Sequence, residues 1–185
     1  KYEDSDTVAL ELDEDTKISG TYDLVVNGAV DDIKSASDWS YRNKFKSFAS
    51  LKESDSFGYV GQLAGYAQAS GLKAGGWWVI NKANGSFKYI SADGLDMVEE
   101  LYKIKKTALA VKSDKLERCF DAVDEVFNGK KTGNKILGSE CSWCSYRHAC
   151  WPTLKELPAL KSRAKEPKTV SYVHIKEEDN NERVS

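Results

Sequence analysis

Two aspartates and a lysine flank a turn signal near the start of the chain. Asp23 precedes the pair Asn27-Gly28, and Asp32 and Lys34 follow it. Asn-Gly is the preferred pair for a two-residue type I′ hairpin turn, because both central residues need a positive φ. That register places Asp23 opposite Asp32, and the alternation of side chains puts Lys34 on the same face as Asp32.

Opposed carboxylates destabilise a sheet, and a divalent cation would offset this cost. Mg²⁺ or Mn²⁺ binds two carboxylates and keeps positions open for water and substrate. Such a metal polarises a phosphoryl group and supplies a hydroxide-like nucleophile, while a neighbouring lysine stabilises charge on the phosphate. The trio therefore predicts metal-dependent phosphodiester hydrolysis. The alternative is that Asp23 and Asp32 are surface residues, which Lys34 neutralises.

Strands and helices must position this trio. Besides the hairpin of residues 20–34, alternating apolar residues and turn signals predict strands over residues 7–12, from about 17, and over 76–82 and 87–90. A helix over residues 57–70, with Gly71 as its C-cap, places Tyr59, Gln62 and Tyr66 on one face. We expect a loop and a short helix over 38–56. These elements predict an α/β fold with a mixed β-sheet flanked by helices.

Two further helices are expected at residues 94–111 and 113–128. The second carries an apolar stripe at helical spacing: Leu116, Cys119, Phe120, Val123, Val126 and Phe127. Gly129 would end this helix, and a basic loop would follow it. Beyond about residue 160 the chain is polar and without periodicity, which is typical of a tail that is disordered or docks on a partner.

With the trio and the helix in view, the chain resembles the RecB-like exonuclease branch of the PD-(D/E)XK nuclease superfamily. The matching segments are Gly20-Thr21-Tyr22-Asp23, Asp32-Ile33-Lys34 and Gln62-Leu63-Ala64-Gly65-Tyr66. They correspond in order to the G-x-x-D, D-x-K and Q-x-x-x-Y elements of that branch. The resemblance covers roughly residues 7–151 and implies a restriction-endonuclease-like core.

The resemblance also implies roles for these residues. Asp23 and Asp32 would bind the catalytic Mg²⁺ or Mn²⁺, the backbone carbonyl of Ile33 would add a ligand, and Lys34 would be the catalytic lysine. Gln62 and Tyr66 would contact substrate or brace Lys34. The implied activity is that of a deoxyribonuclease, of exonuclease type, in recombination, repair or phage DNA processing.

One element of that branch is missing from the sequence. The branch takes a further metal ligand, a His or Glu, from a helix before the first strand, and too few residues precede the strand here for such a helix. We expect this helix to lie upstream of Lys1, and Glu11 is the substitute within the chain. If no ligand replaces it, the chain is a catalytically incomplete, nuclease-like module for DNA binding or assembly.

Three cysteines cluster near the end of the predicted core. Cys141, Cys144 and Cys150 have a C-x₂-C-x₅-C spacing, which suits Zn²⁺ or an iron–sulfur cluster. Cys119 is either the fourth ligand or a core cysteine on the apolar stripe. His148 would complete a zinc site, and reduced thiols without a bound metal are the remaining alternative. The resemblance favours a structural [4Fe–4S] cluster, because some RecB-like nucleases carry a similar triplet.

Composition bounds the setting. The chain of 185 residues is 41% hydrophobic and 30% charged, with a net charge of −2, as in an ordinary globular domain. No apolar run approaches the ~20 residues that span a membrane, and nothing near the start resembles a signal peptide. We expect a cytoplasmic protein without membrane contact, encoded by a cell or a phage.

The expected partner is DNA, as single strands or duplex ends. Residues 42–52 carry four basic and no acidic residues, interleaved with aromatics, so they suit phosphates and bases. An ordinary solvated face is the alternative interpretation. The protein would act alone, as a homo-oligomer or in a larger recombination or repair complex. We expect a nuclease core at 1–137, a cysteine segment packed on it at 138–160 and a polar tail at 161–185.

Overall fold

The computed structural model describes residues 2–3, 5–113 and 118–176. The chain divides into two units, residues 1–114 and 115–185, and each is described by itself. The first unit is built from β1 (Tyr2–Glu3), β2 (Asp6–Asp13), β3 (Thr16–Tyr22), β4 (Leu24–Val26), β5 (Ala29–Ala36), α1 (Asp38–Arg42), η1 (Lys44–Lys46), α2 (Phe48–Glu53), α3 (Tyr59–Ser70), β6 (Lys73–Asn81), β7 (Phe87–Ser91) and α4 (Met97–Lys112).

A five-stranded mixed sheet is the centre of the first unit, with the order β1-β4-β5-β6-β7. Strands β5 and β6 are parallel, and the segment from α1 to α3 connects them. The other neighbours in the sheet are antiparallel. The predicted α/β class with a mixed sheet is therefore confirmed.

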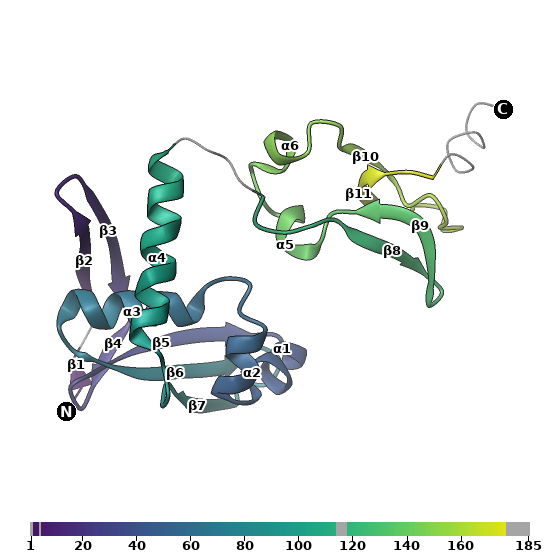
Figure 1. Cartoon of the computed structure of the whole chain (residues 1–185). Coiled ribbons are helices and arrows are strands. Elements are labelled where there is room, and N and C mark those ends of the chain that lie inside the picture. The colour runs from purple at the N-terminus through teal and green to yellow at the C-terminus, as the bar shows by residue number, and fades with distance from the viewer. Residues whose placement is uncertain (1, 4, 114–117, 177–185) are drawn as a thin grey trace. The chain divides into compact units, whose positions relative to one another are not determined.

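The helices of this unit cover one face of the sheet, where α3 crosses the strands (Figure 1). Apolar side chains from α2, α3 and the sheet form the core there; its fully buried members include Val30, Leu51, Leu63, Trp77 and Val79. The hairpin β2–β3 forms a sheet of its own and, with α4, extends from the same side (Figure 1). The core therefore lies between α3 and the face of β5 that carries Asp32.

Local residues define several helix ends of the first unit, and the predicted C-cap at Gly71 is confirmed. Helix α3 ends at Gly71, which has a φ of +70°, as a C-cap glycine requires. Helix α4 begins after Asp96, whose side chain accepts a hydrogen bond from the Glu99 amide. The predicted loop and short helix of residues 38–56 are three short helices, two of them capped by a serine side chain.

The second unit is a four-stranded sheet with two short helices, in place of the predicted helix and tail. Its elements are β8 (Val123–Phe127), β9 (Lys130–Ile136), α5 (Ser139–Ser142), α6 (Arg147–Cys150), β10 (Lys155–Pro158) and β11 (Thr169–His174). The strand order is β10-β11-β9-β8. Strands β10 and β11 come from sequence that we assigned to the end of the cysteine segment and to the polar tail. The division between the units falls after Asp114, not at 137.

The predicted helix over 113–128 is wrong where the structure describes it. Val123, Val126 and Phe127 lie in β8 and are at least 40% exposed. Asn128 and Gly129 have φ values of +49° and +76°, so they form a tight turn into β9, and the predicted basic loop is that strand. The Asn-Gly pair thus predicts this turn correctly, and the helical spacing of the apolar residues does not predict a helix here. Leu116, which we assigned to the same stripe, lies outside the described residues.

A buried polar network, rather than a large apolar core, joins the strands of the second unit. Glu125 accepts hydrogen bonds from the Tyr172 hydroxyl at 2.6 Å, from Asn134 Nδ2 at 2.8 Å and from Thr132 Oγ1 at 2.7 Å. Among described residues 118–176, the buried hydrophobic residues are Leu137, Trp151 and Tyr172. Domains with so small a core usually need a metal or a cross-link for stability.

No helix within the described residues is long and apolar enough to cross a membrane.

Candidate active site

The hairpin of β4 and β5 has the predicted turn and register. Asn27 and Gly28 have φ values of +51° and +80°, as a type I′ turn requires. Val26 pairs with Ala29, and the ladder continues to the pair of Leu24 and Asp31. The predicted strand register is therefore confirmed for these three residue pairs.

Asp23 lies just beyond this ladder, between β3 and β4. Its Oδ2 accepts a hydrogen bond of 2.6 Å from the backbone N–H of Ile33, which directly follows Asp32 in β5. This bond replaces a ladder contact and holds the Asp23 carboxylate beside Asp32. The two carboxylates are therefore neighbours, as the turn predicts, although one is held by a side-chain bond.

Asp32 is a buried carboxylate, with 3% of its surface exposed, on the sheet face that α3 covers. Burial raises its pKa from 3.8 to about 6, because the charged form loses hydration. The close contact with Lys34 and its positive charge lower the pKa of Asp32, and the charge of Asp23 raises it further. The interpretation of Asp32 as a surface residue is therefore wrong.

The Lys34 ammonium contacts three groups at once. Its Nζ lies 2.6 Å from Asp32 Oδ2, donates to Gln62 Oε1 at 2.9 Å, and lies 4.8 Å from the centre of the Tyr59 ring. The contact with Asp32 is an ion pair. Among the described residues, the buried Asp32 Oδ2 has no hydrogen-bond partner besides this ion pair. A cation or a proton at the site would therefore share this oxygen with Lys34.

Gln62 and Tyr66 complete the cluster from α3. Because an ammonium group can only donate, Gln62 must turn Oε1 toward Lys34, and its Nε2 then donates to the Tyr66 hydroxyl at 2.9 Å. The structure therefore brings together five predicted residues: Asp23, Asp32, Lys34, Gln62 and Tyr66. Gln62 and Tyr66 lie side by side on the helix because they are four residues apart.

Sequence reasoning missed the reason for a glycine at position 20. A Cβ atom added to Gly20 in β3 would lie 2.7 Å from Cε1 of the Tyr66 ring. Only a glycine lets the Tyr66 ring pack this closely on the strand. The signal was present in the sequence, since a glycine inside a strand often marks a close approach of another group.

A second buried acid, Asp31, was also missed. It lies on the opposite side of β5 from Asp32 and is 1% exposed. Its carboxylate accepts hydrogen bonds from Trp78 Nε1 at 2.8 Å and from the Tyr89 hydroxyl at 3.1 Å. Burial raises the pKa of Asp31, and these hydrogen bonds counteract the rise. Asp31 is therefore a structural acid that joins three strands, outside the candidate site.

Glu11 lies elsewhere. It is exposed in β2 and pairs with Lys17 of β3, five residues along that strand from Tyr22, which is about 17 Å at the rise of a strand. In the part of the chain that the structure describes, no three His, Cys, Asp or Glu side chains gather as metal ligands. The site thus supplies two carboxylates, and Glu11 does not provide the third.

A groove of about 990 Å³ borders Gln62 and Tyr66. It lies among the hairpin β2–β3, α3 and α4, and its lining is mostly apolar, with Val8, Leu10, Ile18, Ile104 and Val111 among its residues. The site therefore has open volume on its α3 side.

Many of the basic residues expected to guide DNA are engaged by acids. Arg42 pairs with Asp38, and Lys52 pairs with Glu99. Lys103, Lys131 and Lys135 each lie 2.5–2.8 Å from a carboxylate oxygen of Glu99, Glu100 or Asp124. Within residues 103–135, Lys103, Lys112, Lys131 and Lys135 thus have acidic partners, while Lys34 and Lys44 both lie close to the Tyr59 ring.

The four cysteines all belong to the second unit, where they are thiols rather than disulfides. The pKa of Cys141 is raised by burial and then by Cys144, Cys150, Glu140 and Cys119. All three other thiols are therefore close enough to act on Cys141, although they do not form a closed metal site. Cys119 is exposed and outside any helix, so its interpretation as a core cysteine on a helical stripe is wrong.

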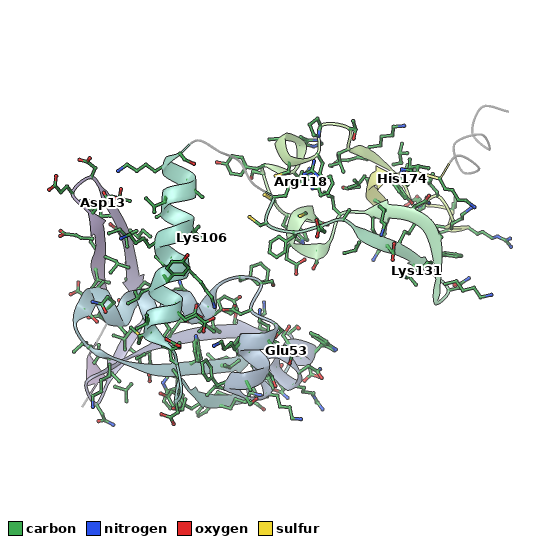
Figure 2. All side chains as sticks on the ribbon, in the orientation of Figure 1. Asp13, Glu53, Lys106, Arg118, Lys131 and His174 are labelled. Carbon is green, nitrogen blue, oxygen red and sulfur yellow. The ribbon has the colours of Figure 1, made fainter. Side chains whose placement is uncertain are left out.

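Basic and aromatic side chains lie in the cysteine segment or contact it. Arg118, labelled in Figure 2, donates from Nε to the Cys150 carbonyl at 2.9 Å and lies 4.0 Å from the centre of the buried Trp151 ring. Trp143 and Tyr146, two aromatic residues of the cysteine segment, are 89% and 66% exposed. His148 lies 3.9 Å from Glu156.

Comparison of the chain with protein-family models, with curated proteins and with solved structures finds no significant match. The candidate site therefore depends on its own residues and geometry.

Proposed function

We propose that the protein is a metal-dependent deoxyribonuclease of exonuclease type, which hydrolyses phosphodiester bonds at Asp23, Asp32 and Lys34. The observation that supports this most is the continuous contact chain from Asp32 through Lys34 and Gln62 to Tyr66, with Asp23 held beside Asp32 by the Ile33 amide. Two carboxylates and an ammonium group at one point are a suitable donor set for a phosphate and a divalent cation.

The residues fit Mg²⁺ or Mn²⁺. Asp32 Oδ2 is buried and has no hydrogen bond among the described residues besides its ion pair with Lys34, and burial and then the Asp23 carboxylate raise the pKa of Asp32, so a cation would offset both costs. Asp23, Asp32 and the Ile33 carbonyl would hold the ion, and water would complete the coordination, as is usual for Mg²⁺. When bound, the ion would supply Lewis acidity and an activated water.

The protein groups would orient and stabilise the substrate. Lys34 would place its ammonium charge on the scissile phosphate, and Gln62 would keep that ammonium in position. Tyr66 would in turn fix the Gln62 amide. The parallel pair β5–β6, with its helical connection, supports the restriction-endonuclease-like core and the RecB-like branch that the three sequence segments imply.

The cysteines are proposed as a structural site for a [4Fe–4S] cluster, with Zn²⁺ as the alternative. Cys119, Cys141, Cys144 and Cys150 supply four thiolates, which suffices for either. The small apolar core of this unit supports a need for such a cross-link. In this proposal Cys119 is the fourth ligand, and His148 is not needed.

One observation favours the second function, a catalytically incomplete DNA-binding or assembly module. Among the described residues only two carboxylates gather at the site, and no third acid joins them. If this module is the function, the chain binds DNA with or without a divalent ion and does not cleave it.

Cleavage of an end-labelled single-stranded DNA with Mg²⁺ or Mn²⁺ tests the proposal. Asp32→Asn and Lys34→Met should each lower the rate by at least about 100-fold. Glu53→Gln is the matched control, because Glu53 is exposed on α2 (Figure 2) and its change also converts a carboxylate to an amide. Equal rates in all four proteins would refute a nuclease site here, and DNA binding without cleavage would favour the second function.

A further inference from the structure

Three aromatic rings lead from the core to the surface beside Lys34. Phe45 is 3% exposed and stacks on Tyr59, with ring centres 6.0 Å apart. Tyr59 is half-buried and stacks on Phe57, again at 6.0 Å. Phe57 is 68% exposed. Phe57 thus presents a flat apolar ring that is packed on Tyr59 and largely exposed to solvent.

Two ammonium groups flank this row of rings. Lys34 Nζ lies 4.8 Å from the centre of the Tyr59 ring, and Lys44 Nζ lies 4.7 Å from the same ring. Lys44 also lies 5.1 Å from the centre of the Phe57 ring. The middle ring thus links the charge of the candidate active site to a second positive charge beside the exposed ring.

The loop that carries Phe57 is held in a defined conformation. Both oxygens of Asp55 accept backbone hydrogen bonds at the start of α3, from Tyr59 N–H at 2.9 Å and Val60 N–H at 2.8 Å. Gly58, which lies between Asp55 and Tyr59 in the chain, has a φ of +74°, which a glycine adopts without strain. A ring on such a turn loses little conformational entropy when a ligand covers it.

We infer that Phe57 is a stacking platform for an unpaired base of single-stranded DNA, with Lys44 beside it for the backbone phosphate. The inference rests on the proposed function, because Lys34 connects this platform to the site of hydrolysis. An unpaired strand offers open base faces, whereas each base of a duplex is covered by its neighbours. The two ammonium groups favour a polyanion over a protein as the partner.

Fluorescence anisotropy of labelled oligothymidylate, measured on the full chain in EDTA, tests the platform without cleavage. Phe57→Ala should weaken binding by about 5- to 100-fold, the usual loss for one base–aromatic stack. Phe57→Trp should bind nearly as well as the wild type, because it keeps a stacking ring. Phe57→Ala and the wild type should bind a blunt duplex of equal length with the same affinity.

Phe87→Ala is the matched control. Phe87 is 69% exposed, so its truncation removes the same ring from a similar exposure. It pairs with Ile80, the residue after Val79, and Val79 is the partner of Lys34. Phe87 therefore lies on the sheet face opposite to Lys34, and its change should leave DNA binding unaltered.

An oligonucleotide with one abasic position locates the stacked base. When the abasic position is moved along the oligonucleotide, wild-type affinity should fall at the one position where the missing base would stack on Phe57. Phe57→Ala should show no such fall, because both changes remove the same contact. Equal single-strand affinities of Phe57→Ala and Phe87→Ala would overturn the platform, and a protein partner for Phe57 would give this result. Equal losses for single strand and duplex would also overturn it.

The platform and the proposed function fail in different ways. If Phe57→Ala binds normally while Asp32→Asn abolishes cleavage, only the platform is refuted. If wild-type protein neither binds nor cleaves DNA, the proposed function is refuted and the platform with it.

Discussion

The Lys34 ammonium donates a 2.9 Å hydrogen bond to Gln62 Oε1, and this bond joins strand β5 to helix α3 at the candidate site. The residues are 28 positions apart in the chain. Without Gln62, the ammonium would keep its ion pair with Asp32 but lose its second polar contact. The orientation of Lys34 is therefore a property of the helix as much as of the strand.

Gln62→Ala should lower cleavage by about 10- to 100-fold, because it removes the acceptor that holds the Lys34 ammonium in position. Tyr66→Phe should have a smaller effect, since it removes only the group that orients Gln62. Single-turnover rates measure both. Gln68→Ala, at another exposed glutamine of α3, is the control and should cleave at the wild-type rate. A Gln62→Ala protein as active as this control would show that Lys34 needs no such partner.

Gly20→Ala should destabilise the protein by about 1–3 kcal/mol, because the new methyl group would lie 2.7 Å from the Tyr66 ring. Urea unfolding measures the free energy. Gly61→Ala is the comparison, since its Cβ would lie 3.6 Å from the nearest atom and alanine favours a helix. We expect no loss of stability there. Equal stability of the two variants would argue against close packing of Tyr66 on β3.

The contribution of Asp32 to the stability of the metal-free protein should fall as the pH rises from about 4 to about 6. The folded pKa of Asp32 is raised from 3.8 to about 6, so in this window the folded protein binds a proton that the unfolded chain has released. Stability is therefore lost as the pH rises, by about 2–3 kcal/mol at 1.4 kcal/mol per unit of pKa.

Urea unfolding in EDTA measures the free energy of unfolding of wild type and of Asp32→Asn at each pH. The difference between the two proteins isolates the contribution of Asp32, because the contributions of the other titrating groups cancel. Asp32→Asn should gain stability relative to wild type as the pH rises, and Mg²⁺ at pH 7 should stabilise wild type more than the variant. Parallel stability curves from pH 4 to pH 7 would contradict the raised pKa of Asp32.

A preparation with a bound cluster should be brown and absorb near ~400 nm, and Cys119→Ser should lose this colour as fully as Cys141→Ser. The physical reason is that four thiolates are needed and Cys119 is the fourth thiol near Cys141. Iron and zinc analysis of each variant is the measurement. His148→Ala should keep its metal. Retention of full metal content in Cys119→Ser would remove Cys119 from the ligand set.

The failed helix prediction shows where local patterns mislead. The Asn-Gly pair at 27–28 correctly predicted a hairpin, and the same pair at 128–129 marked a hairpin that the helical spacing of Val123, Val126 and Phe127 concealed. Spacing over so short a run does not separate a helix from an exposed strand. The turn signal was the more reliable one, because only a few residue pairs accept two positive φ values.

The sequence by itself determined the turn of the first hairpin, the neighbourhood of Asp23 and Asp32, and the shared face of Gln62 and Tyr66. These follow from local geometry: a turn with a defined register, alternation along a strand and 3.6 residues per helical turn. Tertiary packing decided the rest. It buried Asp32, raised its pKa and placed Gln62 against Lys34, because dehydration and contact depend on which elements pack together, and no local pattern encodes that.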